Sequence, residues 1–200
     1  MLAIIDYKAG NLTSVRNAFA ALGVEAAVTA DPETIRRAER VVFPGVGAAG
    51  SAMANLASLG LLEAVREAAG SGRPFLGICL GMQILFERSE EDGGVETLGI
   101  LPGQVRRFPD VPGFKVPEIG WNQVERPEGV AQDAWTGWGK EYYFVHSYYA
   151  ETGACTVGTT EYAGVTFTSA VRRGGLVAYQ FHPEKSGRIG LALLEDFLKC

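Results

Sequence analysis

The 200-residue sequence predicts a single α/β domain, residues 1–200, built on a mixed, mainly parallel central sheet that helices flank. Two observations lead to this prediction. In the first half, short apolar runs alternate with segments of helical periodicity, a pattern typical of parallel strands joined by right-handed crossovers. In the second half, apolar runs follow one another too closely for a helix to fit between them, which favours antiparallel pairing. No linker, repeat or low-complexity tract divides the chain.

The first half supplies the expected parallel part of the sheet. Its apolar runs have the length of strands, and its helical segments carry apolar side chains three and four residues apart. Glycine or proline ends several of these segments, as at Gly23, Pro44-Gly45 and Gly60. In chain order we expect a strand over 2–5, a helix over 11–22, strands over 24–29 and 40–43, helices over 51–59 and 61–69, a strand over 74–78 and a helix over 80–88.

The second half supplies the expected antiparallel strands and the last helix. Glycine turns, such as Gly164 and Gly174-Gly175, separate runs that are rich in aromatic and β-branched residues. The final segment has apolar residues on one helical face. We expect strands over 105–108, 142–149, 155–161, 165–171 and 176–181, and a helix over 189–198.

Composition excludes several classes of protein. The 23 acidic and 18 basic residues give a net charge of −5, and no basic run exceeds two residues, so we expect no nucleic-acid partner. Three cysteines without a CxxC pair indicate neither a disulfide framework nor a metal site. The apolar run over 2–5 has no basic residues before it, and no stretch reaches the length of a membrane span. We therefore expect a cytoplasmic protein that contacts no membrane.

The segment Gly77-Ile78-Cys79-Leu80-Gly81 is the strongest chemical signal in the chain. It lies between an apolar strand and a helix, and it has the form of a nucleophile elbow with cysteine in place of serine. The turn holds the nucleophile in a strained conformation, and glycine two residues away on each side avoids a clash. The helix N-terminus favours a thiolate at Cys79, and the Leu80 N–H can donate to an oxyanion. The alternative is an inert, buried thiol in a glycine-rich turn.

A thiol nucleophile needs a base, and the chain has only two histidines. His182 precedes Pro183, which favours an extended conformation, so His182 and Glu184 should point to the same side. The carboxylate can then orient the imidazole, as in a catalytic triad. The alternative is a surface histidine followed by a helix-capping glutamate. His146 lies in an aromatic strand, and we favour a core position for its side chain over a catalytic role.

The turn Gly45-Val46-Gly47 follows a strand and can bring backbone N–H groups close to a substrate carbonyl. An ordinary loop is the alternative. The turn does not match a Walker A motif, and the spacing of Gly45, Gly47 and Gly50 gives poor support for a dinucleotide site, because the first βα turn lacks the pattern.

These motifs, Gly77 to Gln83 and His182 to Glu184, resemble those of the class I (triad) glutamine amidotransferases, and the resemblance covers essentially the whole chain. It implies a flavodoxin-like fold and glutamine hydrolysis without a cofactor. It further implies that Cys79 attacks the side-chain amide of L-glutamine, that His182 relays the proton, and that Glu184 orients His182.

The resemblance also implies which residues bind the substrate. They are Gly47, Gln83 and Glu91, together with the main chain of His146, Ser147 and Tyr148. The oxyanion formed on the amide needs two donors. The Leu80 N–H is one, and we hypothesise that the Gly45-Val46 peptide supplies the other after a rearrangement that glycine allows at low steric cost.

Six further motifs occur along the chain: Ile5-Asp6-Tyr7 with Gly10-Asn11, Pro44-Gly45-Val46-Gly47, Gly81-Met82-Gln83, Gly120-Trp121-Asn122, Phe144 to Tyr148, and His182 to Ser186. Together they resemble one branch of the family, the glutaminase subunits of histidine biosynthesis. This resemblance implies a heterodimer in which a (β/α)8 cyclase subunit receives the ammonia, with Asn11, Tyr143 and Lys185 at partner-facing positions. The alternatives are a glutaminase subunit of another pathway, an inactive binding module of the same fold, and a cysteine peptidase.

Overall fold

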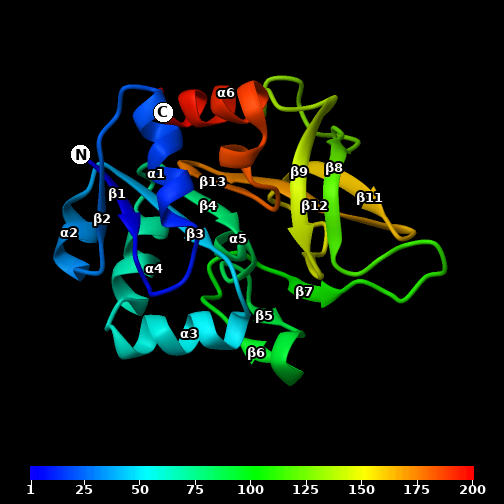
Figure 1. Cartoon of the computed structure of the whole chain (residues 1–200), viewed down its shortest axis with the longest axis horizontal. Helices are drawn as coiled ribbons and strands as arrows, with labels where there is room; N and C mark the ends of the chain where they lie inside the picture. The colour runs from blue at the N-terminus through cyan, green and yellow to red at the C-terminus, as the bar shows by residue number, and fades with distance from the viewer.

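In the computed structural model, which describes residues 1–200, eleven strands form one sheet and two more form a separate ribbon (Figure 1). Five strands make the parallel half of the sheet, in the order β2-β1-β3-β4-β13. Three of these strands consist wholly of buried residues, because helices cover both faces. The parallel strands are β1 (Leu2–Ile5), β2 (Ala26–Thr29), β3 (Arg40–Gly45), β4 (Phe75–Cys79) and β13 (Leu176–Tyr179).

The antiparallel half continues from β13 in the order β12-β10-β7, and β11 also pairs with β12. Two short strands, β5 and β6, complete the edge, and β5 runs parallel to β7. The mixed sheet predicted from the sequence is therefore confirmed. The strands of this half are β5 (Arg88–Ser89), β6 (Val95–Glu96), β7 (Gln104–Arg107), β10 (Tyr148–Ala150), β11 (Thr156–Tyr162) and β12 (Val165–Arg173).

The sheet has two apolar cores, one on each face, and alternate residues of β1 belong to different cores. Ala3 and Ile5 belong to the core that α2, α3 and α4 cover, whereas Leu2 and Ile4 belong to the core under α1 and α6. Figure 1 shows α1 and α6 together on one face. No helix is both long and apolar enough to cross a bilayer. The helices are α1 (Leu12–Ala21), α2 (Pro32–Arg37), α3 (Ala49–Ser58), α4 (Leu62–Gly70), α5 (Leu80–Gln83) and α6 (Gly187–Leu198), with 3₁₀ turns η1 (Glu91–Gly93) and η2 (Pro183–Lys185).

The helix expected over 80–88 is wrong in length, because α5 ends at Gln83. The carbonyls of Ile84, Leu85 and Phe86 do not continue a helical ladder. They accept hydrogen bonds from the N–H groups of residues 98–101 instead, at 2.8 to 2.9 Å. The loop at residues 98–101 thus provides hydrogen-bond donors to the carbonyls that would otherwise have bonded within a longer helix.

The strand expected to stop at Phe43 continues through Pro44 to Gly45, where it pairs with Cys79. Within a parallel strand, successive residues point their backbone groups to opposite neighbours. The Val41 N–H donates toward the β4 side, to the Pro74 carbonyl, so Pro44 faces the β1 side. Pairing with β1 ends at Val42, so the missing N–H of proline breaks no ladder bond.

The strand expected over 142–149 is two strands that belong to different sheets. β9 (Lys140–His146) pairs with β8 (Glu118–Val124) in the ribbon, whereas β10 joins the large sheet after a break at Ser147. Sequence reasoning missed β8. It also missed α2, although Asp31 caps that helix by accepting from the N–H groups of Glu33 and Thr34.

Candidate active site

Cys79 occupies the junction between β4 and α5 with φ +53° and ψ −113°. A positive φ is uncommon for a residue with a Cβ atom, and the junction is crowded. A Cβ atom at Gly81 would overlap the Phe43 carbonyl oxygen, and one at Gly77 would lie 2.9 Å from the Ala178 Cβ. The glycines on either side of Cys79 therefore let the strand, the turn and the neighbouring strands approach closely.

The expected contribution of a helix N-terminus to Cys79 needs correction. α5 is a single turn of four residues, so it provides a few N–H groups rather than the aligned dipoles of a long helix. Besides His182, the sulfur has two polar neighbours: the thiol donates to the Val145 carbonyl oxygen, and the Gln180 side-chain amide donates to the sulfur, each at 3.8 Å.

His182 follows β13, whose neighbour in the sheet is β4, so the pairing of these strands brings it to the edge that carries Cys79. Its Nδ1 lies 2.8 Å from Glu184 Oε1, and both side chains are almost completely buried. The backbone differs from the extended chain we expected after His182, because Pro183 begins the 3₁₀ turn η2. The tight turn still brings the carboxylate to the imidazole.

The surroundings of His182 favour its charged form. Burial alone would disfavour a charged ring, but the contact and charge of the Cys79 sulfur, together with Glu184, outweigh burial and raise the pKa of His182 from 6.5 to about 10. His182 Nε2 is buried and outside hydrogen-bond geometry with any protein atom. This arrangement favours an imidazolium that faces the sulfur on one side and a carboxylate on the other.

A cavity of about 410 Å³ opens beside Cys79 and His182. Its volume suits an amino acid, and polar main-chain and side-chain groups line much of it. Two of the lining residues, Pro117 and Val145, were not among the site residues expected from the sequence. Besides Cys79 and His182, the expected site residues that line the cavity are Val46, Gly47, Leu80, Gln83, Glu91, His146, Ser147, Tyr148 and Lys185.

Gly45 lies directly opposite Cys79 in the pairing of β3 with β4. It does not line the large cavity. Together with Asn11, His182 and Glu184 it borders a narrow recess that is too small to hold a water molecule. A Cβ atom at Gly45 would lie 2.5 Å from the Tyr7 hydroxyl, which is buried without a hydrogen-bond partner in the protein. Only glycine fits at this position, because any Cβ atom would overlap the Tyr7 hydroxyl.

Glu91 and Gln83 enter the cavity from different elements. Glu91 Oε2 accepts from the Ala49 N–H at 2.7 Å and so caps α3. Ala48, the N-cap residue of this helix, has no polar side chain that could do so. Burial raises the pKa of Glu91, although the bond from Ala49 opposes this effect. Gln83 Nε2 donates to the Tyr148 carbonyl at 2.7 Å. Both side chains are therefore held in place by the protein.

His146 has a structural side chain, as we expected for a core histidine. Its Nδ1 lies 2.7 Å from the Tyr148 carbonyl oxygen, which can only accept, so Nδ1 carries a hydrogen. Its Nε2 lies 3.0 Å from Glu118 Oε2, outside hydrogen-bond geometry, and both side chains are buried. This contact holds β8 to the main chain of residues 145–148, which borders the cavity.

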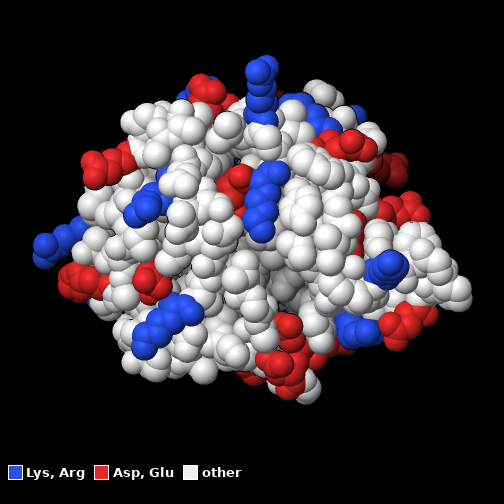
Figure 2. All heavy atoms as spheres, viewed as in Figure 1, with Lys and Arg blue, Asp and Glu red and all other residues white.

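The three residues expected at a partner interface lie on the His182 side of the cavity. Asn11 caps α1 by accepting from the Ser14 N–H. Tyr143 accepts from the His182 N–H through its carbonyl, and the Lys185 ammonium lies 5.8 Å from its ring. On the face drawn in Figure 2, Lys and Arg side chains are scattered among acidic ones rather than gathered in one area.

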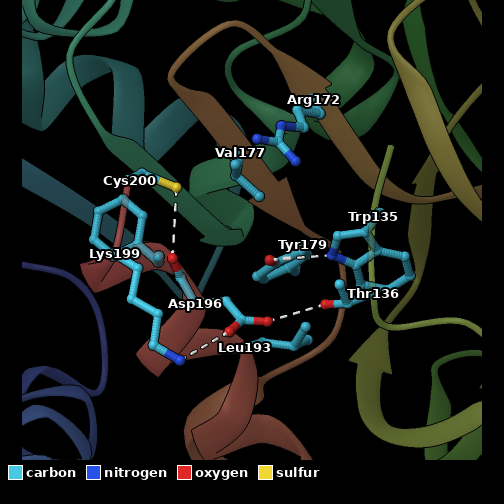
Figure 3. Close-up of a pocket in the computed structure, with 10 residues that line it drawn as sticks. Trp135, Thr136, Arg172, Val177, Tyr179, Leu193, Asp196, Lys199 and Cys200 are labelled. Carbon is cyan, nitrogen blue, oxygen red and sulfur yellow. Dashed lines mark hydrogen bonds and ion pairs between the residues drawn. The ribbon is translucent and has the colours of Figure 1, made fainter. Parts of the chain in front are cut away.

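A second cavity, of about 400 Å³, shares no lining residue with the first. It lies against α6 and contains none of the site residues expected from the sequence (Figure 3). Its polar groups already bond to one another. Trp135 Nε1 donates to the Tyr179 hydroxyl, and Thr136 and Lys199 bond to the Asp196 carboxylate. The cavity beside Cys79, by contrast, is lined by His182, whose Nε2 has no hydrogen-bond partner in the protein.

A family model described as glutamine amidotransferase class-I matches residues 3–200. The chain belongs to this family. Solved structures agree with the fold. A crystal structure of a glutamine amidotransferase superposes with a TM-score of 0.72 at 20% identity, over 98% of this chain and 97% of the other. PurLQS from Thermotoga maritima gives a TM-score of 0.71 at 16% identity, over 99% and 97%.

Curated relatives define the branch of the family. Imidazole glycerol phosphate synthase subunit HisH of Desulfovibrio desulfuricans is 52% identical over 98% of this chain and 93% of its own. The HisH subunits of Moorella thermoacetica and Methanothermobacter thermautotrophicus are 50% and 48% identical, over 98% and 100% of this chain and 93% and 98% of theirs. Within the family, the chain lies in the HisH branch.

Proposed function

We propose that this chain hydrolyses L-glutamine to L-glutamate and ammonia with Cys79, His182 and Glu184, and passes the ammonia to the cyclase subunit of imidazole glycerol phosphate synthase. The observation that carries this proposal is the buried contact of 2.8 Å between His182 Nδ1 and Glu184 Oε1, beside a cysteine held at φ +53° on the wall of an amino-acid-sized cavity. Its family and the HisH branch agree with this chemistry.

The reaction proceeds in two covalent stages. The Cys79 thiolate attacks the side-chain carbonyl carbon of glutamine and forms a tetrahedral adduct. His182 gives its proton to the amide nitrogen, so ammonia leaves and a glutamyl thioester remains. A water molecule then gives a proton to His182, attacks the thioester and releases glutamate. Glu184 keeps the His182 ring oriented and favours its charged form throughout.

The negative oxygen of the adduct needs two hydrogen-bond donors. The Leu80 N–H is the first, because Leu80 follows the nucleophile and lines the cavity. The second is the Gly45-Val46 peptide, which reaches the site only after it rotates. Losing one such donor lowers the rate by about 10²–10³-fold, so the rotation can keep the subunit slow until its partner is loaded. Equal glutaminase rates for the chain alone, with partner, and with partner plus its ligand would contradict this gating.

The ammonia acceptor is a (β/α)8 cyclase subunit that forms a heterodimer with this chain. It docks around Asn11, Tyr143 and Lys185, of which Lys185 lines the cavity and lies over the Tyr143 ring. The exposed Trp121, whose ring lies 6.2 Å from that of Tyr143, extends this surface with an apolar side chain. The reaction uses no cofactor and takes place in the cytoplasm, where the unpaired cysteines stay reduced.

Replacement of the nucleophile tests the proposed function. Cys79→Ala should abolish the use of glutamine, because no other group in the cavity can form the thioester. The complex of this variant with the cyclase should still turn over when ammonium is supplied, because the cyclase reaction takes place elsewhere. Cys155→Ala, a half-buried cysteine outside the cavity, serves as the matched control. Glutamine-dependent turnover that survives in Cys79→Ala would refute the assignment.

A further inference from the structure

Gln180 is a buried side chain with no role in the reaction described so far. It is fully buried, and its two polar atoms face two residues of the site. Its Oε1 accepts from Gln83 Nε2 at 2.9 Å, and its Nε2 lies 3.8 Å from the Cys79 sulfur. Gln180 therefore stands between a residue that lines the cavity and the atom we assign as nucleophile.

The orientation of these amides follows from the Tyr148 carbonyl. A carbonyl oxygen can only accept, and this one lies 2.7 Å from both Gln83 and the His146 ring. The atom of Gln83 that faces it must therefore be the NH₂ group. Since the same NH₂ group lies 2.9 Å from Gln180, the facing atom of Gln180 must be its oxygen. The NH₂ group of Gln180 is then the one directed at the sulfur.

The position of Gln180 in the chain gives it a fixed relation to the base. It lies two residues before His182, directly after β13, and its own N–H donates to the Ser169 carbonyl of β12 at 2.9 Å. One short segment thus presents an amide donor and an imidazole to the same sulfur. Both of these groups favour a negative sulfur, whereas the Val145 carbonyl oxygen, 3.8 Å away, accepts from a neutral thiol.

We propose that Gln180 is a positioning residue for the nucleophile, with an amide N–H that holds the Cys79 sulfur and favours its anionic form. This inference rests on the proposed function, because it takes Cys79 as the nucleophile. It assigns a second task to Gln83, whose bond to the Tyr148 carbonyl prevents the Gln180 amide from turning over. The Tyr148 carbonyl also accepts from the His146 ring, which contacts Glu118. The His146–Glu118 contact is therefore linked to the sulfur through this carbonyl, Gln83 and Gln180.

Two substitutions separate this role from simple packing. Gln180→Glu keeps the shape and can still accept from Gln83, but it places an oxygen against the sulfur. Gln180→Met removes the donor and adds no charge. The measurement is the rate of Cys79 alkylation by iodoacetamide from pH 5 to 10 in the full chain carrying Cys155→Ala and Cys200→Ala. Gln132→Glu, on an exposed loop, is the matched control for the added charge.

In Gln180→Glu we expect the pH midpoint of alkylation to rise by about one unit, with about a tenfold slower reaction at pH 7. Gln180→Met should show a smaller shift in the same direction, and Gln132→Glu none. Unchanged midpoints in both Gln180 variants would overturn the inference, and so would slower alkylation at every pH without a shift, since this indicates lost access. If Gln180→Glu does not fold, Gln180→Met decides alone. Failure of the proposed function is a separate result, since it requires glutamine turnover in Cys79→Ala.

Discussion

At the scale of single residues, the site depends on the contact of His182 with the Glu184 carboxylate, two positions later in the chain. The contact between His182 and Glu184 could be predicted from the sequence, because residues so close along the chain meet in almost any tight conformation. The contact between Gln180 and Cys79 could not, since it joins residues 101 positions apart through a sheet pairing that no local pattern contains. The rule that residues two apart in an extended chain lie on the same side applies to residue 180 as well as to 184. The sequence does not show, however, which atom the side chain of residue 180 contacts.

Glu184→Gln should lower the rate of glutamine hydrolysis by about 10²–10⁴-fold, because the ring loses its orienting anion. The variant also tests the charge of His182. The Cys79 sulfur and, to a smaller extent, Glu184 raise the folded-state pKa of His182 from the ordinary 6.5 to about 10. The charged ring therefore contributes its full stability below pH 6.5 and loses it as the pH rises through 10, and Glu184 supplies part of this contribution. The difference in free energy of unfolding between wild type and variant, measured in urea, should therefore shrink between pH 7 and pH 10.5. A constant difference would contradict the charged state.

At the scale of helices and strands, local signals predict the existence of elements better than their ends. Asp31-Pro32-Glu33 is a recognisable helix start, and α2 could have been found from it. The end of α5 could not, because the groups that replace its helical bonds come from residues 98–101. Likewise, the break at Ser147 follows from β9 and β10 pairing with different sheets, whereas their sequences form one aromatic run.

The cap on α3 links an element to the site, because Glu91 both caps this helix and faces the cavity. Glu91→Gln should cost about 1 kcal/mol of stability through the weakened cap. It should also raise KM for glutamine about 10–100-fold with little change in kcat, since we assign the carboxylate to the substrate.

The pH dependence separates these two effects of Glu91. Because burial raises its pKa, wild-type KM should climb on acidification before an ordinary carboxyl group of pKa 4.5 would titrate, and the variant should lack this climb. Glu63→Gln, an exposed glutamate on α4, is the control. An unchanged KM in Glu91→Gln would remove Glu91 from the substrate site.

At the scale of the whole molecule, the two halves of the sheet each supply part of the site. β3 and β4 carry Gly45 and Cys79, β13 leads to His182, and the break between β9 and β10 contributes the main chain around Ser147. The carboxyl ends of the parallel strands could be predicted to meet, because the βα alternation fixes their direction. The contribution of the ribbon could not be predicted, because β8 carries no recognisable strand signal. The pairing of β8 with β9 brings Glu118 next to His146.

The most direct test of glutamine hydrolysis at Cys79 is covalent labelling of this residue by a glutamine analogue. The full chain is treated with 6-diazo-5-oxo-L-norleucine, a glutamine-analogue electrophile, and then analysed by intact-mass and peptide mass spectrometry. We predict one adduct per chain, on Cys79, with an excess of L-glutamine slowing its formation and with Cys155 and Cys200 unmodified. An adduct elsewhere, or equal labelling of the three cysteines regardless of glutamine, would contradict the claim that Cys79 and His182 form a glutamine-hydrolysing site.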